Sequence, residues 1–117
     1  MPYEPLLTCP PVRPRRGTTD ELRDALLELA QGRATIVEHG EKPWASITFT
    51  GSRHRLELGF EGAEAVEAGE LFVALLAEHE FAIPGQLVAD ATVTDVDHRL
   101  DPPLMRVHCE LLLLEDA

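Results

Sequence analysis

The sequence is short of cations and of the motifs that mark common enzymes. Its 117 residues hold 10 Lys or Arg against 21 Asp or Glu, a formal net charge of -11. This excess of negative charge repels phosphate backbones and anionic headgroups, so we expect neither nucleic acid nor membrane as a partner. The chain lacks GxSxG, HExxH and a phosphate-binding glycine loop. These absences exclude the enzyme classes that depend on those motifs.

Cysteine and long apolar segments are also scarce. Cys9 and Cys109 are the only two cysteines and neither belongs to a CxxC pair, so we expect no disulfide framework, metal site or cofactor. No apolar run approaches the ~20 residues that span a bilayer, and the first residues lack the pattern of a secretory signal. A cytoplasmic protein is the expectation. Nine Arg against one Lys, with no Asn, indicate GC-rich codons and hence a bacterial source.

The length is that of one domain, since domains commonly hold ~100–150 residues. Residues 1–17 contain five of the nine prolines and three arginines. Because proline fixes φ and lacks a backbone donor, this segment is predicted to be an extended, basic N-terminal arm. Residues 18–117 are predicted to form a single α+β domain.

Two segments have helical periodicity. Apolar residues from Leu22 to Ala30 recur on one face, Thr18 and Glu21 have capping-box spacing, and Gly32 follows, so the pattern predicts a helix over 19–31. Early acidic residues and later apolar ones predict a second helix from Ala63 to about 79.

The remaining regular pattern alternates polar and apolar residues, as strands do. Gly51 and Ser52 fit a two-residue hairpin turn between two such runs. The predicted order is α-β-β-β-α-β-β, a mainly antiparallel sheet with two helices packed on one face. The predicted strands are 33–38, 43–50, 53–60, 86–96 and 104–114.

The last two strands suggest a register from their apolar residues. Pairing Val93 with Val107 and Ala91 with Cys109 makes one face apolar and sets Asp90 opposite Glu110 on the other. Two opposed carboxylates beside a histidine could transfer protons, although any solvated sheet face has a similar composition. The candidate binding residues on this face are Asp90, Thr92, Arg106, His108 and Glu110.

Two further side chains are candidates for binding. His54 falls on the apolar face of its strand, where a neutral imidazole requires a hydrogen-bond partner. It would either line a ligand pocket between sheet and helix or be a hydrogen-bonded histidine at the sheet rim. Trp44 falls on the polar face, where an exposed Trp favours a contact surface.

One end of the predicted sheet is apolar on both faces. Leu112 and Leu114 share a side with His108, and Val88 lies beside them in the predicted register. Such a patch requires a cover, either the chain's own arm or a second subunit. Val88, Leu112 and Leu114 are therefore the predicted interface residues of a symmetric homodimer.

In element order, size and acidity the chain resembles type III secretion chaperones, although their closing helix is absent. The resemblance implies an acidic, dimeric, non-catalytic protein. The leading hypothesis is thus a small acidic binding or assembly module, chaperone-like or adaptor-like, with itself or a basic protein as partner. The alternative is a small enzyme or ligand-binding protein that uses Asp90, His108 and Glu110, or a pocket near His54.

Overall fold

Two helices and a four-stranded antiparallel sheet make up the described part of this α+β protein. The structure, a computed structural model, describes residues 17–115. In this range the element order is α-β-β-α-β-β, and the strands lie in the order β1-β2-β4-β3. The elements are α1 (Thr18–Leu29), β1 (Thr35–Ala45), β2 (Thr50–Glu61), α2 (Ala63–Leu75), a short 3-10 turn (Leu76–Glu78), β3 (Gln86–Leu100) and β4 (Pro103–Glu115).

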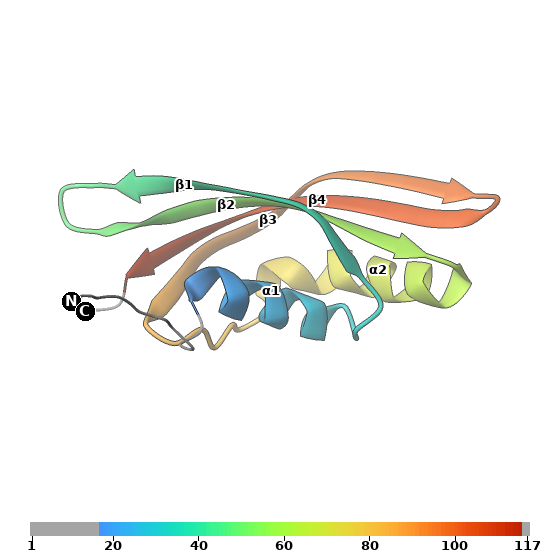
Figure 1. Cartoon of the computed structure of the whole chain (residues 1–117), viewed down its shortest axis with the longest axis horizontal. Coiled ribbons are helices and arrows are strands. Elements are labelled where there is room, and N and C mark those ends of the chain that lie inside the picture. Colours follow the sequence, from blue (N-terminus) through green and yellow to red (C-terminus); the bar gives the residue numbers. More distant parts are fainter. Residues whose placement is uncertain (1–16, 116–117) are drawn as a thin grey trace, which may run out of the picture.

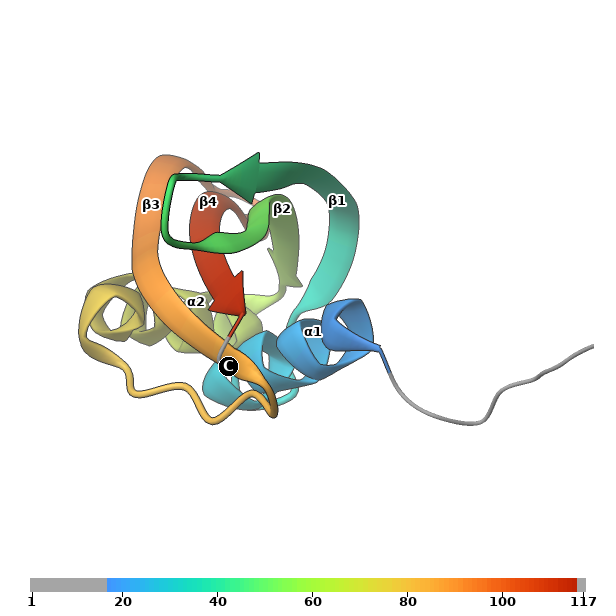
Figure 2. The same ribbon diagram turned by 90° about the vertical axis from the view of Figure 1, so that its left-hand side faces the viewer.

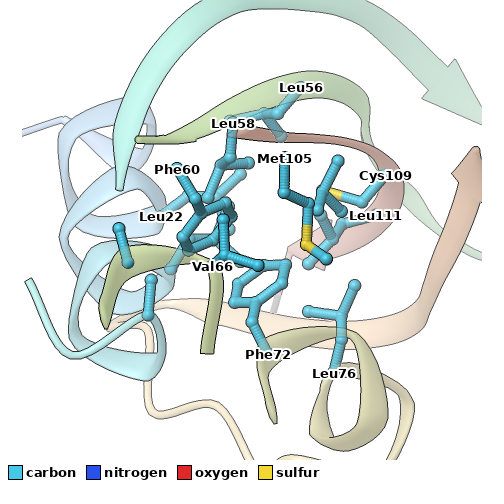
Figure 3. Packing of buried hydrophobic residues seen from close by; sticks show 14 of the residues in the cluster. Leu22, Leu56, Leu58, Phe60, Val66, Phe72, Leu76, Met105, Cys109 and Leu111 are labelled. Atoms are coloured by element: carbon cyan, nitrogen blue, oxygen red, sulfur yellow. The ribbon is translucent and has the colours of Figure 1, made fainter. Parts of the chain in front are cut away.

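Both helices lie on the same side of the sheet (Figure 1), as the sequence predicts. Leu22 and Leu26 of α1 and Phe72 of α2 are fully buried against the apolar side chains of β2 and β4, where Figure 3 shows the packing. Gly69 allows α2 to approach the sheet closely, because a Cβ there would lie 2.8 Å from the Met105 sulfur. The core therefore lies between the two helices and the two central strands.

The boundaries of α1 are close to the predicted ones, but its cap differs. Gly17 is the N-cap, and its carbonyl accepts a hydrogen bond from the Glu21 amide, so the Thr18 capping box is not formed. At the other end Gln31 and Gly32 both have positive φ, and the Gly32 amide donates to the Leu27 carbonyl. This left-handed ending is the one that glycine favours.

The prediction of two separate strands at 33–38 and 43–50 is wrong. Residues 35–45 form one continuous strand, because Gly40 adopts extended backbone opposite Arg55 and Pro43 lies on an edge strand, where a missing donor is tolerated. The hairpin turn is at residues 46–49, where Ser46 and Phe49 exchange backbone and side-chain hydrogen bonds. The element order behind the resemblance to secretion chaperones is thus not the observed one.

Gly51 has another role than the predicted turn. It lies inside β2, opposite Trp44 of β1 and Leu114 of β4, and a Cβ would lie 1.9 Å from the Leu113 carbonyl oxygen. Glycine is required there because the backbones of β2 and β4 approach each other closely.

The predicted pairing of β3 with β4 is shifted. Val93 lies opposite Cys109 rather than Val107, and Ala91 lies opposite Leu111. Two irregularities, between Val88 and Asp90 and between Val93 and Asp95, each change the register of β3 by one residue. Bulges of this kind add a residue to one strand and break the alternation on which the prediction depended.

The two hairpins extend past the helices at opposite ends of the long axis (Figure 1), and Figure 2 shows the β1–β2 hairpin end-on. We call residues 41–55 the β1–β2 arm and residues 46–49 its tip. No helix in the described residues 17–115 is long and apolar enough to cross a membrane. The predicted N-terminal arm falls almost entirely outside that range.

Candidate functional site

A chain of hydrogen bonds links α1 to the base of the β1–β2 arm, and we call its members the polar chain. Arg23 Nε of α1 donates to His39 Nδ1 of β1 at 2.9 Å. His39 Nε2 is 2.9 Å from His54 Nδ1, and His54 Nε2 is 2.8 Å from Ser52 Oγ on β2. His54 is fully buried, so the imidazole that the sequence places on the apolar face has its partners.

The direction of every proton in the polar chain follows from the arginine. Because Arg23 can only donate, His39 Nδ1 is an acceptor and the proton of this neutral ring is on Nε2. His39 Nε2 then donates to His54 Nδ1, which leaves the proton of His54 on Nε2. His54 therefore donates to Ser52 Oγ. Each member donates toward Ser52, and both histidines are neutral.

This polarity excludes one chemical role. A serine nucleophile requires a neighbouring imidazole nitrogen without a proton to accept its hydroxyl hydrogen. His54 Nε2 carries a proton and offers Ser52 a donor instead. The polar chain orients the hairpin relative to α1 and does not activate Ser52.

The surroundings of both rings favour the neutral form. Burial is the main cause that lowers the pKa of His39, and the repulsion that its protonated ring would meet from a protonated His54 and from Arg23 lowers it further. Burial also lowers the pKa of His54. Glu41, opposite His54 in the β1–β2 ladder, raises both pKa values but does not outweigh burial.

A small pocket lies beside the end of the polar chain. Its volume is about 220 Å³, and Glu41, Ser52 and Glu115 are among its lining residues. Glu41 is held there by Thr19, whose Oγ1 donates to Glu41 Oε1 at 3.0 Å. The fully buried His54 ring does not line this pocket, so a ligand in it would meet carboxylates and the Ser52 hydroxyl.

The predicted polar sheet face exists, but its members are arranged differently. Asp90 lies opposite Leu112, so the predicted Asp90–Glu110 pair is wrong; Thr92 lies opposite Glu110. His108 faces Glu57 on one side and Asp95 on the other. The shifted register of β3 separates the two carboxylates whose proximity suggested proton transfer.

The arginines near this face form ion pairs with glutamates. Arg106 Nη1 is 2.8 Å from Glu57 Oε2, and Glu110 lies between Arg53 and Arg55 at 3.9 and 3.5 Å. These contacts join β2 to β4 across the sheet. Pairs of this kind at a partly exposed surface contribute at most about 1 kcal/mol each to stability.

The predicted interface residues lie near the end of β4. β4 is a central strand between β2 and β3, so the segment Leu111–Leu114 is not an edge of the sheet. Leu114 is buried within the chain, whereas Val88 and Leu112 are partly exposed. Trp44, also partly exposed, lies on the β1–β2 arm. A dimer contact through these residues stays a prediction.

The sequence points to His54 but not to the residues that hydrogen-bond to it, His39 and Ser52, nor to Arg23, which hydrogen-bonds to His39. His39 falls between the predicted strands 33–38 and 43–50, and the helical pattern of 19–31 does not single out Arg23. The continuous strand over 35–45 places His39 and Glu41 on the same face as His54. The apolar-face histidine was the signal that a partner was needed.

Among residues 17–115, no cluster of three or more His, Cys, Asp or Glu could hold a metal ion. Cys109 is a buried free thiol whose pKa burial raises to about 12. A thiol held in its protonated form is a poor nucleophile and metal ligand.

Comparisons with known proteins identify a similar fold but no family. No family model and no curated protein matches the sequence. A chain from the solved structure titled "Virion of native gene transfer agent (GTA) particle" is similar over 85% of this chain and 92% of its own length, with a TM-score of 0.53 and 10% sequence identity. At that identity the likeness shows the fold.

Proposed function

We propose that the protein is a non-enzymatic assembly subunit that binds further copies of itself within a multi-copy particle. The observation that carries the proposal is the apolar tip of the β1–β2 arm, which extends past the helices (Figure 1). Ile47 is fully exposed and Phe49 is half-exposed there. Apolar side chains at the end of a projecting, ordered hairpin serve a contact better than they serve an isolated monomer.

The fold supports the same proposal. The similar chain of the gene transfer agent structure belongs to a virion, and this chain would likewise be a structural component. Two copies are the smallest such assembly, and a basic protein is a second partner class that the net charge of -11 favours.

The arrangement of titratable groups supports a non-enzymatic role. In residues 17–115, His39 and the buried His54 belong to the polar chain, in which His54 donates toward Ser52, and Glu110 lies near two arginines. The small pocket beside Ser52 has no neighbouring general base among the members of that chain. Binding between proteins requires none of these groups to react.

Light scattering after size-exclusion chromatography tests the proposal over a concentration series. We expect a mass that rises with concentration to at least twice the 12.9 kDa of one chain. A mass of one chain at every concentration up to the millimolar range, where even contacts of about −4 kcal/mol would form, contradicts self-assembly.

A further inference from the structure

We infer that the tip of the β1–β2 arm of one copy binds the groove beside α2 on the next copy. This inference rests on the proposed function, because it names the contact through which the copies would associate. It commits to a second copy of this chain as the occupant of the groove.

The tip is ordered and apolar. The Phe49 amide donates to Ser46 Oγ at 3.1 Å, and the Ser46 amide donates to the Phe49 carbonyl at 2.8 Å, which closes the turn. The closed turn presents Ile47 and Phe49 to solvent. Because the turn is already fixed, burying these two side chains against a partner costs little backbone entropy.

The groove is large enough for such a tip. It has a volume of about 640 Å³ and lies between α2 and the residues that follow α1. Leu71 is 45% exposed and gives it an apolar patch, and Glu67 and Glu70 add negative charge. Arg33 and Glu64 also line it and bond to each other at 2.9 Å. An apolar, cationic occupant is the one that this lining fits.

The charges of the two surfaces are opposite. The β1–β2 arm carries Lys42, Arg53 and Arg55 against Glu41, and Glu110 of β4, 3.9 and 3.5 Å from the two arginines, offsets one of these positive charges. Residues 63–80, which include α2, carry five glutamates and no Lys or Arg. Attraction between unlike charges would orient the arm toward the groove before the apolar contact forms.

The two surfaces lie toward opposite ends of the molecule. Figure 1 shows the tip at one end of the long axis and the start of α2 at the other, and the longest dimension is 60 Å. One copy therefore cannot fill its own groove. Each copy offers one tip and one groove, and such a head-to-tail contact generates a ring or a filament.

Two single variants test the contact in the full chain. Ile47→Asp makes the tip polar, and Leu71→Arg places a bulky cation in the groove against a basic arm. Each should weaken self-association at least about tenfold, which corresponds to ~1.4 kcal/mol. The matched controls are Leu100→Asp, on the opposite hairpin, and Leu75→Arg, on α2 outside the groove lining. Both controls should stay within about twofold of wild type. Circular dichroism verifies that every variant is folded.

Mixing the two variants gives the sharper result. The groove of the Ile47→Asp chain and the tip of the Leu71→Arg chain are both intact, so an equimolar mixture should form a dimer and nothing larger. Native mass spectrometry resolves the two chains and shows whether the dimer contains one of each.

The outcomes separate the inference from the proposed function. If wild type associates while both variants associate equally well, or if the mixture forms no mixed dimer, the tip-to-groove contact is wrong and self-assembly stands. In that case Leu112→Asp, which should leave a tip-to-groove assembly intact, would test the predicted dimer contact through Val88, Leu112 and Leu114. If wild type stays a single chain, the proposed function itself fails.

Discussion

Substituting two glycines by alanine tests the packing that holds β2 in place. At Gly51 the new Cβ would lie 1.9 Å from the Leu113 carbonyl oxygen and 2.9 Å from Leu114 Cα, which are backbone atoms of a paired strand. At Gly69 it would meet side-chain atoms, the Met105 sulfur at 2.8 Å and the Phe60 ring at 3.0 Å. A backbone obstacle can be relieved only if β2 and β4 separate, whereas a methionine can change its rotamer.

The expected losses of stability differ accordingly. Overpacking costs about 1–3 kcal/mol, and in a helix Ala regains about 1 kcal/mol over Gly, so Gly69→Ala should lower the free energy of unfolding by about 0–2 kcal/mol. Gly51→Ala has no such compensation, and we expect a loss of about 3 kcal/mol or more. For a domain of this size that corresponds to a Tm lower by more than about 10 °C.

Urea unfolding followed by far-UV circular dichroism measures both losses. The ranking of the two variants is the critical result, because it depends only on what each Cβ meets. If Gly51→Ala costs no more than Gly69→Ala, β2 and β4 do not approach each other as closely as the structure has them, and the pairing of Gly51 with Leu114 is wrong.

Two further predictions concern titratable groups. Because burial lowers the pKa of His39 and His54 below the usual 6.5, the unfolded chain binds more protons than the folded one as pH falls through that value. The free energy of unfolding should therefore stay constant above pH 7 and decrease below about 6.5. In urea titrations, the double variant His39→Gln, His54→Gln should show a weaker dependence on pH. In a Cys9→Ala chain, Cys109 should react with a thiol reagent only after denaturant is added, because burial raises its pKa to about 12. Rapid reaction of the native protein would show that the core around β4 opens.

The sequence predicts the helices and the buried faces because both depend on short-range periodicity. Leu22 and Leu26 are buried as their spacing indicates, and so are Leu56 and Leu58. The turn was misplaced because Gly51 has two possible uses. A glycine between alternating runs can supply positive φ in a turn or space for a neighbouring backbone, and only the presence of β4 beside β2 decides between them.

The candidate site could be predicted less well, because it depends on pairing rather than on pattern. Two irregularities in β3 change which residues face β4, and no alternation in the sequence marks them. His54 was recognised because a histidine on an apolar face requires a partner. Its partner His39 was hidden by Gly40, which resembles a turn signal but lies within an edge strand.

The polar chain and the exposed apolar tip belong to one arrangement. A two-stranded hairpin is marginally stable on its own, so an arm that presents Ile47 in a fixed position requires support at its base. β4 supports it by pairing with β2 as far as Gly51, and Arg23 supports it by hydrogen bonding through His39 and His54. An arm held in this way loses little conformational entropy when its tip is bound. His39 and His54 thus connect the arm to α1 and hold it in position.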